Sequence, residues 1–483
     1  MPASIASLRE QHSRFWNRYA RRVRCALSLA LLILVLVVAS GCGGGSTVIA
    51  GSTPTPTPLP TPAPTPSSST AVTLGFFGTP PDALGVQMGT GPFTSVAPPS
   101  SPTGVTSFSV PNGISKYVIA YLCRTAGSLQ SPPLSNEFMI EATLQDATSL
   151  KVDCSGNVTF LSGAAPTLGS VSGNMDATAF PNSKFVHISG KQGFSGSADL
   201  LGPFTASLPA GTNDIAFVLL DNGGNLAVLG KALGIKIFRD QTVPGTVNGG
   251  NTITFGSNDF PPNQQLNVNA PAGFVVDGQL TEVTYTTAGG TVFPLENGSA
   301  IYQSVPQALV QTGDFYSYGS EAATAGGASA VGIYQATSNG GGLFTLNLPD
   351  PWSPSNPPAN GSPVIFTFDY PGFPGIPTFA QRAELNWQTQ CCISANSIMV
   401  TATANFQNGA NTISIPDPSL AGQGFFTCCP SSMNIGWSAS ILGATAPLSF
   451  LESNFKAISI RGGVLPAGAS AAFVHTSGGF TTP

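Results

Sequence analysis

The chain has 483 residues, and its 17 Lys and Arg and 22 Asp and Glu make up only 8% of them. Globular proteins usually carry about 25% charged residues. The deficit excludes a nucleic-acid binder, which needs a basic surface to neutralise phosphates, and it excludes a charge-rich coiled coil. The 56 glycines and 42 prolines exclude a mainly helical protein, because both residue types break helices.

The first 41 residues predict a signal peptide of the bacterial lipoprotein type. Six arginines from Arg9 to Arg24 precede an apolar stretch from Ala26 to Ala39, which is too short to span a bilayer comfortably but suits a signal peptide. The following Ala39-Ser40-Gly41-Cys42 resembles a bacterial lipobox, in which small residues precede a cysteine that is acylated and becomes the mature N-terminus. This copy has Ala39 where leucine is usual.

The lipobox resemblance implies a palmitate-carrying membrane anchor at Cys42 and, because Gly43 rather than aspartate follows, a place in the outer membrane, periplasmic or surface-exposed. An uncleaved signal anchor extending through Cys42 is the alternative. The cleaved lipoprotein signal and the uncleaved anchor both place the rest of the chain outside the cytoplasm. Without the signal, 11 basic and 21 acidic residues remain, a formal charge of -10. Such a chain is not drawn to anionic lipid or nucleic acid, so we expect membrane contact through the lipid.

Residues 42–70 form a Pro/Thr-rich linker behind the anchor. Seven prolines alternate through positions 54–66, a composition that cannot build a core and favours extended polyproline II. At about 3.1 Å per residue, this stretch would hold the rest of the chain roughly 40 Å from the membrane. A disordered linker with no spacing role is the alternative.

From residue 71 onward the dominant period is two, which is typical of strands with one buried face. Runs in which every second residue is apolar lie at 117–123, 138–144, 344–348, 366–370, 398–406 and 433–441. Clusters of Gly, Pro, Asn and Ser separate them, and no sustained helical period follows residue 71. We therefore expect an all-β fold of several consecutive antiparallel β-sandwich modules.

A short turn block recurs before three of the predicted strands. It reads Val110-Pro-Asn-Gly113, Leu208-Pro-Ala-Gly211 and Leu465-Pro-Ala-Gly468, where Pro fixes one turn dihedral and Gly permits a positive one. With its four predicted strands, the stretch 168–241 resembles a carboxypeptidase regulatory-like or transthyretin-type sandwich. The other stretches resemble immunoglobulin-like or fibronectin-like modules of bacterial envelope proteins.

These patterns divide the chain into six expected parts. They are a signal peptide at 1–41, a lipid-anchored linker at 42–70, sandwich modules at 71–160 and 165–242, a β-rich module at 243–375, and an immunoglobulin-like module at 376–483.

Six cysteines remain after the signal and the lipidation site, and an even number in an exported chain favours disulfides. Cys123 ends one predicted strand and Cys154 lies on a later one, so we predict a Cys123–Cys154 bridge. Predicted strands at 398–406 and 411–415 lie between the two adjacent pairs and return the chain to its starting end. We therefore predict one or two cross-bridges between the pairs, without a fixed choice of partners. The four residues concerned are Cys391, Cys392, Cys428 and Cys429. A four-cysteine zinc site and a redox disulfide between adjacent cysteines are the alternatives.

The sequence contains no nucleophile elbow, zincin helix or phosphate loop, and we expect no catalytic residue, cofactor or metal. His187 and His475 are interpreted as surface or strand histidines, and 221–225 as a hairpin turn in preference to a calcium loop. The aromatic residues at 315–318 and Trp352 are either core residues or exposed platforms for sugars. Paired carboxylates for glycoside hydrolysis could still converge from distant loops.

Three functions remain in order of preference. The first is a lipid-anchored envelope protein with a structural, adhesive or interaction role and no catalysis. The second is a carbohydrate-binding or substrate-capturing surface module, and the third is an envelope hydrolase whose site is not visible in sequence. The expected partners are the membrane, through the lipid, and a glycan or protein on the cell surface.

Overall fold

The structure is a computed structural model. It describes residues 69–481 except for several gaps. The gaps are 78, 102–103, 126–132, 161–166, 181, 184, 192–194, 222–230, 279–280, 298–299, 339–341, 356–357, 359–363, 390–393, 416–432, 447–449 and 452–464. Nearly all of the regular secondary structure in the described part is β-strand, which confirms the all-β expectation. Among the described residues, no helix is long and apolar enough to cross a membrane.

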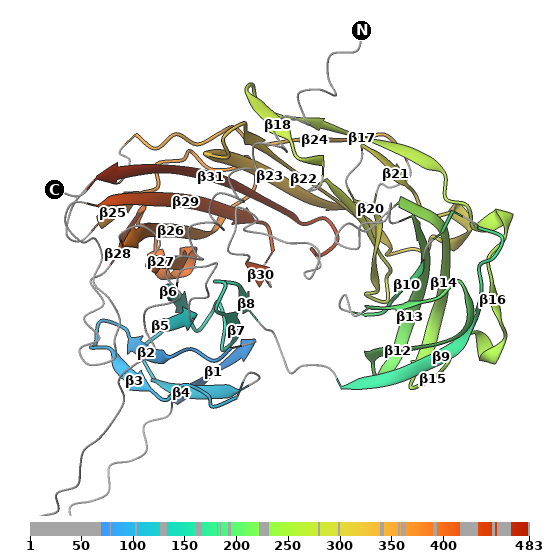
Figure 1. Cartoon of the computed structure of the whole chain (residues 1–483), viewed down its shortest axis with the longest axis horizontal. Coiled ribbons are helices and arrows are strands. Elements are labelled where there is room, and N and C mark those ends of the chain that lie inside the picture. The colour runs from blue at the N-terminus through green and yellow to red at the C-terminus, as the bar shows by residue number, and fades with distance from the viewer. Residues whose placement is uncertain are drawn as a thin grey trace, which may run out of the picture.

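One thirteen-stranded sheet arches through the molecule (Figure 1). From one edge to the other its strands are β20 (Val292–Asn297), β19 (Glu282–Thr286), β22 (Phe315–Thr324), β23 (Ser329–Thr337), β31 (Ser470–Thr481), β29 (Asn434–Ala444), β26 (Thr378–Thr389), β27 (Ser394–Thr403), β6 (Leu134–Thr143), β5 (Lys116–Thr125), β2 (Ala83–Met88) and β3 (Thr94–Val96), with β18 (Phe274–Val276) beside β22.

This large sheet joins stretches that the sequence assigned to separate modules. Strands from 71–160, 243–375 and 376–483 are hydrogen-bonded to one another in it. The expected antiparallel pairing holds for most neighbours, but β27 and β6 are parallel, with Ala395 opposite Leu134 and Ala402 opposite Glu141. These parts therefore share one ladder and are not a row of separately closed sandwiches.

Both faces of the middle of the large sheet are covered. In β27, Ile398 and Val400 contribute to one hydrophobic core, while Met399 between them contributes to a second core on the other face. A strand buried on both faces has a nearly continuous apolar sequence, and the seven consecutive buried residues of β5, from Tyr117 to Cys123, fit this rule.

The first sandwich is built from the β6–β5–β2–β3 end of the large sheet and a second sheet facing it. The second sheet contains, in order, β30 (Phe450–Leu451), β8 (Val158–Phe160), β7 (Ser149–Asp153), β1 (Ser69–Phe77) and β4 (Val105–Pro111). Strand β1 pairs in parallel with β7 and antiparallel with β4. Because β30 follows residue 376, the last part of the chain completes a sheet begun by the first.

The stretch from 168 forms the second sandwich, and its two sheets enclose a core of their own. One sheet contains β11 (Ser195–Ala198), β10 (Phe185–Ser189), β13 (Gly211–Asp221) and β14 (Lys231–Val243); the other contains β12 (Leu201–Pro209), β9 (Leu168–Asp176), β15 (Gly245–Thr246) and β16 (Ile253–Thr254). The 3-10 turns η1 (Val247–Gly250) and η2 (Ser257–Asp259) follow. The core includes Ile253 and Phe255, so this sandwich continues past the expected boundary at residue 242.

Two small sheets contribute to the core on the face of the large sheet opposite the core of the first sandwich. One contains β21 (Ile301–Gln303), β17 (Asn263–Asn269) and β24 (Phe344–Asn347), with the 3-10 turn η4 (Gln307–Leu309) nearby; the other contains β25 (Val364–Thr367) and β28 (Thr412–Ile415).

The sequence placed 398–406 and 411–415 in two successive strands that return the chain. Instead β27 ends at Thr403 and a short helix, α3 (Ala404–Gln407), follows because the Thr403 hydroxyl caps the Phe406 N–H at 3.2 Å. Strand β28 pairs with β25.

Candidate binding site

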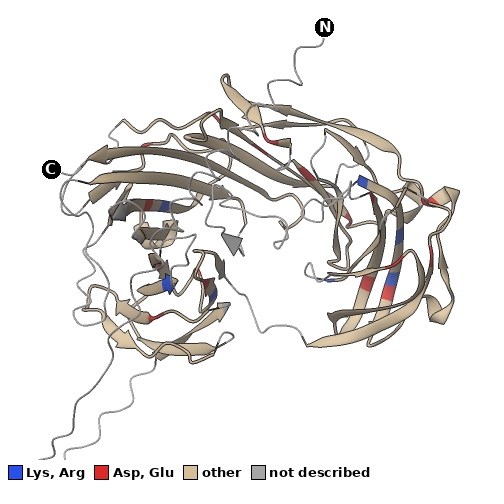
Figure 2. Ribbon diagram, in the orientation of Figure 1, with Lys and Arg blue, Asp and Glu red and all other residues tan. Residues whose placement is uncertain are grey.

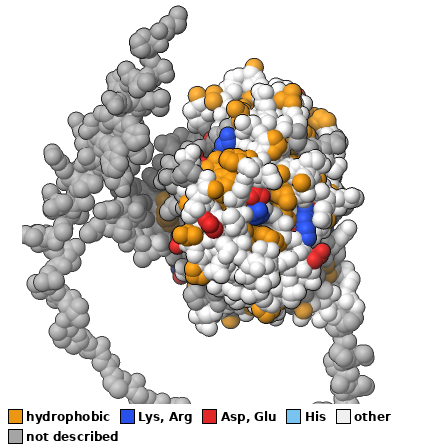
Figure 3. All heavy atoms as spheres, turned by 90° about the vertical axis from the view of Figure 1, so that its right-hand side faces the viewer, with side chains coloured by type: hydrophobic (Ala, Val, Ile, Leu, Met, Phe, Trp, Pro, Cys, Tyr) orange, Lys and Arg blue, Asp and Glu red, His pale blue; other side chains and the backbone are white. Residues whose placement is uncertain are grey.

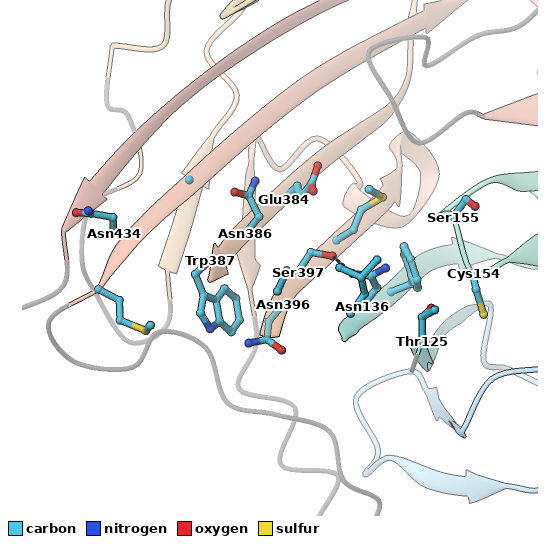
Figure 4. Close-up of a pocket in the computed structure, with 16 residues that line it drawn as sticks. Thr125, Asn136, Cys154, Ser155, Glu384, Asn386, Trp387, Asn396, Ser397 and Asn434 are labelled. Carbon is cyan, nitrogen blue, oxygen red and sulfur yellow. Dashed lines mark hydrogen bonds between the residues drawn. The ribbon is translucent and has the colours of Figure 1, made fainter. Parts of the chain in front are cut away.

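A hollow of about 900 Å³ lies where β6, β26, β27 and β29 meet the first sandwich (Figure 4). Half of its described lining is polar, including four asparagines. These are Asn136, Asn386, Asn396 and Asn434. Thr125, Ser155 and Ser397 add hydroxyls, and Glu384 adds a carboxyl group. Ligand pockets usually measure about 300 to 1,000 Å³ and are mainly apolar, so this hollow has a suitable size and an unusually polar wall.

The register of the large sheet brings part of this lining into one row. Asn136 lies opposite Ser397, Ser397 opposite Asn386, and Asn386 opposite Gly436, so the row crosses four neighbouring strands. The Ser397 hydroxyl donates to Asn136 Oδ1 at 3.0 Å. A Cβ atom at Gly436 would lie 2.4 Å from Asn386 Oδ1, so the glycine leaves the space in which the exposed Asn386 amide lies.

The wall opposite the row is the turn between β7 and β8, and several contacts fix it. Asp153 Oδ1 accepts from the N–H groups of Ser155 at 2.7 Å and Asn157 at 3.1 Å. The Cys123–Cys154 disulfide ties the turn to β5, with 5.6 Å between the Cα atoms, and this confirms the predicted bridge. Gly156 has a φ of 83°, and a Cβ there would come within 2.8 Å of the Phe138 ring. The wall is therefore rigid before any ligand arrives.

Glu384 is the acidic group of the hollow. Burial raises its pKa above the usual value, although a 3.2 Å hydrogen bond from Ser438 and the charge of Arg382 oppose this rise. Arg382, two residues away on the same face of β26, is buried, and its Nε donates to Thr401 Oγ1 at 3.0 Å. Burial lowers the pKa of Arg382 to about 10, which leaves it protonated at neutral pH.

Both remaining histidines are strand residues away from the described lining of the hollow. His187 lies in β10 and His475 in β31. The Nδ1 atom of His475 lies 2.9 Å from the Ser440 hydroxyl. Burial lowers the pKa of each histidine to about 4. Each is therefore neutral at physiological pH and buried or half-buried, so the interpretation as strand histidines holds and the surface alternative does not.

The described lining offers mainly hydrogen-bonding groups and one acidic side chain. Glycoside hydrolysis uses two carboxyl groups across the scissile bond, whereas Glu384 is the only acidic side chain in the described lining. Within the described ranges, no group of three or more His, Cys, Asp or Glu residues could hold a metal ion. The same part of the lining contains no Lys or Arg.

The aromatic residues at 315–318 and Trp352 are core residues, which bears out the first of the two interpretations and not the exposed sugar platform. Phe315 is 7% exposed, Tyr318 0% and Trp352 3%. The Tyr318 ring stacks on Phe344 with 4.0 Å between centroids, and the Trp352 indole donates to Asp369 at 2.8 Å. The aromatic residues at 315–318 lie in β22, which is buried on both faces, and Trp352 lies outside the strands and packs on Phe368.

Other predicted sites fall partly or wholly outside the described residues. The positions that lie wholly outside the described residues are Cys42, Cys391, Cys392, Cys428 and Cys429. The residues flanking the adjacent cysteine pairs come together, since Thr389 lies opposite Ser394 and Trp387 opposite Ile435. Strands β13 and β14 pair antiparallel up to Asp221 and Lys231, as a hairpin requires, while 222–230 are outside the description.

The asparagine row was missed because its members belong to strands far apart in the sequence. Asn136, Ser397 and Asn386 are individually ordinary polar positions on alternating strands, and only the parallel pairing of β6 with β27 aligns them. No local sequence pattern predicts the pairing of β6 with β27.

Neither the models of known protein families nor the curated protein sequences contain a match to this chain. The lipoprotein and regulatory-like resemblances therefore stay predictions, and the ligand of the hollow has to be argued from its own residues.

Proposed function

We propose that the protein is a lipid-anchored protein of the cell envelope, held in the outer membrane by Cys42, that makes adhesive or other binding contacts without catalysis. The observation that carries this proposal is the position of β1. It begins at Ser69, three residues after the last proline of the linker, and lies inside its sheet between β4 and β7. Val72 and Leu74 of β1 are fully buried, so the linker leads directly into a packed body.

The surface supports a displayed role. Charged residues are sparse along the ribbon (Figure 2), and the face in Figure 3 is mostly neutral with isolated charged side chains and small apolar groups. Such a surface is not attracted to phosphate or anionic lipid over long distances. This supports the proposal that the lipid makes the membrane contact and that the partner is a glycan or a protein on the cell surface and not a nucleic acid.

An interaction role is favoured over a purely structural one by the hollow. Its wall is fixed by a disulfide and its polar row is held in register by four strands. Groups fixed before binding lose little conformational entropy when a ligand arrives. This is the property that a binding site needs and that a spacer does not.

The anchor is tested by Cys42→Ala, with Cys25→Ala as the matched control because Cys25 lies inside the signal. We expect the full-length chain and the control to incorporate labelled palmitate and to fractionate with the outer membrane. The Cys42→Ala chain should do neither. Equal palmitate labelling and outer-membrane recovery of the Cys42→Ala chain would refute the anchor.

A further inference from the structure

We infer that the hollow beside β26 and β27 binds a neutral saccharide chain. This inference rests on the proposed interaction role, but it does not depend on the lipid anchor. It assigns a ligand class to a site whose described lining contains several amides and hydroxyls, one carboxyl group and no basic side chain.

The charges of the hollow exclude several other ligand classes. Phosphate and carboxylate ligands are usually bound by Arg or Lys, and the described lining has neither. A divalent cation needs several oxygen ligands, usually with more than one carboxylate, but Glu384 is alone there. Burial also raises the pKa of Glu384, because its charged form is poorly solvated there. A neutral, hydrogen-bonding ligand remains.

The polar groups match hydroxyls in their donors and acceptors. An asparagine amide offers two donors and an acceptor, and a serine hydroxyl donates and accepts. A sugar hydroxyl also donates and accepts, so either orientation finds a partner. Asn136, Ser397 and Asn386 lie on successive strands, which are about 4.8 Å apart. The row therefore extends about 10 Å across the strands and suits a chain better than a single ring.

The apolar side chains beside the row are packed into the protein. Phe138 and Met399 lie on the same strand faces as Asn136 and Ser397, and Trp387 also contributes to the lining. Phe138 is 4%, Met399 5% and Trp387 4% exposed, so these side chains support the lining from within the cores, and the amides and hydroxyls carry the contact with the ligand. Figure 4 shows Asn386, Ser397, Asn136 and Ser155 around one common space.

The test uses the full-length protein in a zwitterionic detergent without a sugar headgroup. The probes are immobilised hexasaccharides of neutral glucose, in α and β linkage, and of N-acetylglucosamine, with an acidic hexasaccharide and an extended neutral peptide for comparison. We expect binding to at least one neutral hexasaccharide and none to the acidic one. Stronger binding to the peptide, or equal binding to the acidic probe, would overturn the assignment, as would failure to bind any neutral hexasaccharide.

Asn386→Ala is the decisive variant because the side chain is exposed and its loss leaves the packed core intact. Loss of one ligand hydrogen bond should raise Kd about tenfold. Gly436→Ala should have a similar effect by displacing the same amide. Asn269→Ala, an exposed asparagine on β17 outside the lining, is the control and should bind like wild type. Binding that Asn386→Ala leaves unchanged would refute this site.

The outcomes separate this inference from the proposed function. If the Cys42→Ala experiment fails but wild type binds a hexasaccharide through Asn386, the saccharide site stands and the envelope anchor does not. If the protein is anchored and folded but binds no neutral saccharide, the anchor stands and the saccharide site is refuted.

Discussion

The first and second sandwiches are attached to the large sheet in different ways. The first continues its hydrogen bonding, since β6 pairs in parallel with β27 over eight residue pairs from Ala395–Leu134 to Ala402–Glu141. The second shares no strand with it and instead packs the outer face of β13 and β14 against the core of the large sheet. Ala216, Val218 and Ile235 belong to that core.

The polar side-chain contacts also differ between the first join, where the first sandwich meets the rest of the large sheet, and the second join, where the second sandwich packs against it. At the first, Asp146 accepts from the Thr403 hydroxyl and the Asn405 amide, both at 2.7 Å. At the second, Arg239 bonds to Asp314 at 2.6 and 3.1 Å and to Asp214 at 3.0 Å. Figure 2 shows acidic and basic positions side by side on β13 and β14. An ion-pair network thus makes the polar contact at the second join, where no backbone ladder joins the parts, whereas at the first join the contacts of Asp146 add to a ladder.

Asp314→Ala should give the largest effect by breaking the second join. It removes one of the two carboxylate partners of the Arg239 guanidinium and the acceptor of the Tyr285 hydroxyl, which donates to Asp314 at 2.5 Å. Removing one member of a buried pair costs about 3 to 5 kcal/mol. Hydrogen exchange should show that loss in the opening free energy of β13 and β14. The exposed Asp199→Ala is the control, and an equal change in both variants would contradict the prediction.

Acid should open the same join. Burial acts to raise the pKa values of Asp214 and Asp314, but hydrogen bonds, including those from Arg239, outweigh it and hold both below the usual 3.8. The unfolded chain therefore binds these protons first. Stabilisation is complete above about pH 4 and is lost as the pH falls through the folded pKa values. Hydrogen exchange that is unchanged in β13 and β14 below pH 4 would contradict this.

Replacing Cys123 and Cys154 with serine should weaken the first sandwich. The two cysteines are 31 residues apart in sequence, and a closed loop of this size stabilises by about 3 to 4 kcal/mol through loss of chain entropy in the unfolded state. Urea unfolding of the double variant measures this loss in the free energy of unfolding. Because the second sandwich has no part in this loop, exchange in β13 and β14 should stay at the wild-type rate, and an increase there would show that the two joins are coupled.

His475 gives the large sheet its own pH dependence. Burial, assisted by the charge of Arg382, lowers the pKa of His475 from 6.5 to about 4. The unfolded chain therefore binds this proton first as the pH falls. The folded protein keeps its full stability above pH 6.5 and loses this contribution as the pH falls to about 4. At about 1.4 kcal/mol per pKa unit, the loss reaches about 3 kcal/mol. His475→Gln should flatten this part of the pH profile in β29 and β31. His187→Gln should leave those strands unchanged, and a steep profile in His475→Gln would contradict the assignment.

Asp146→Ala should have the smallest of these effects, because the backbone ladder of the first join remains. Hydrogen bonds to a charged group contribute about 1.5 to 3 kcal/mol when removed, and the half-buried position of Asp146 places the expected loss near the lower end. Asn405→Ala removes one of the same contacts and should lose less. A loss as large as that of Asp314→Ala would show that side chains, and not the ladder, carry the first join.

Much of the local structure could be predicted from the sequence. Alternation identified the core faces of β27 and β29, where Ile398, Val400 and Trp437 are buried together. The Cys123–Cys154 bridge followed from strand ends. The turn block before β13 ends at Gly211, whose φ is 102°, as a positive-φ glycine was expected there.

Partner choice between distant strands could not be predicted. Nothing in the sequence of β6 distinguishes β27 as its neighbour some 260 residues later, because side-chain period fixes the face of a strand and not its partner. The asparagine row depends on that pairing and was missed with it. The helix α3 was read as strand because Ala404 and Phe406 continue the alternation, whereas the Thr403 cap ends the strand.

Hydrogen exchange of β6 at single-residue resolution tests the shared ladder most directly. A strand at the edge of a separate sandwich has every second amide unpaired, whereas β6 lies between β5 and β27. Both alternating sets of amides between Ser135 and Glu141 should therefore exchange slowly. Fast exchange of the set that does not bond to β5 would show that the first sandwich ends at β6 and that the large sheet is not continuous.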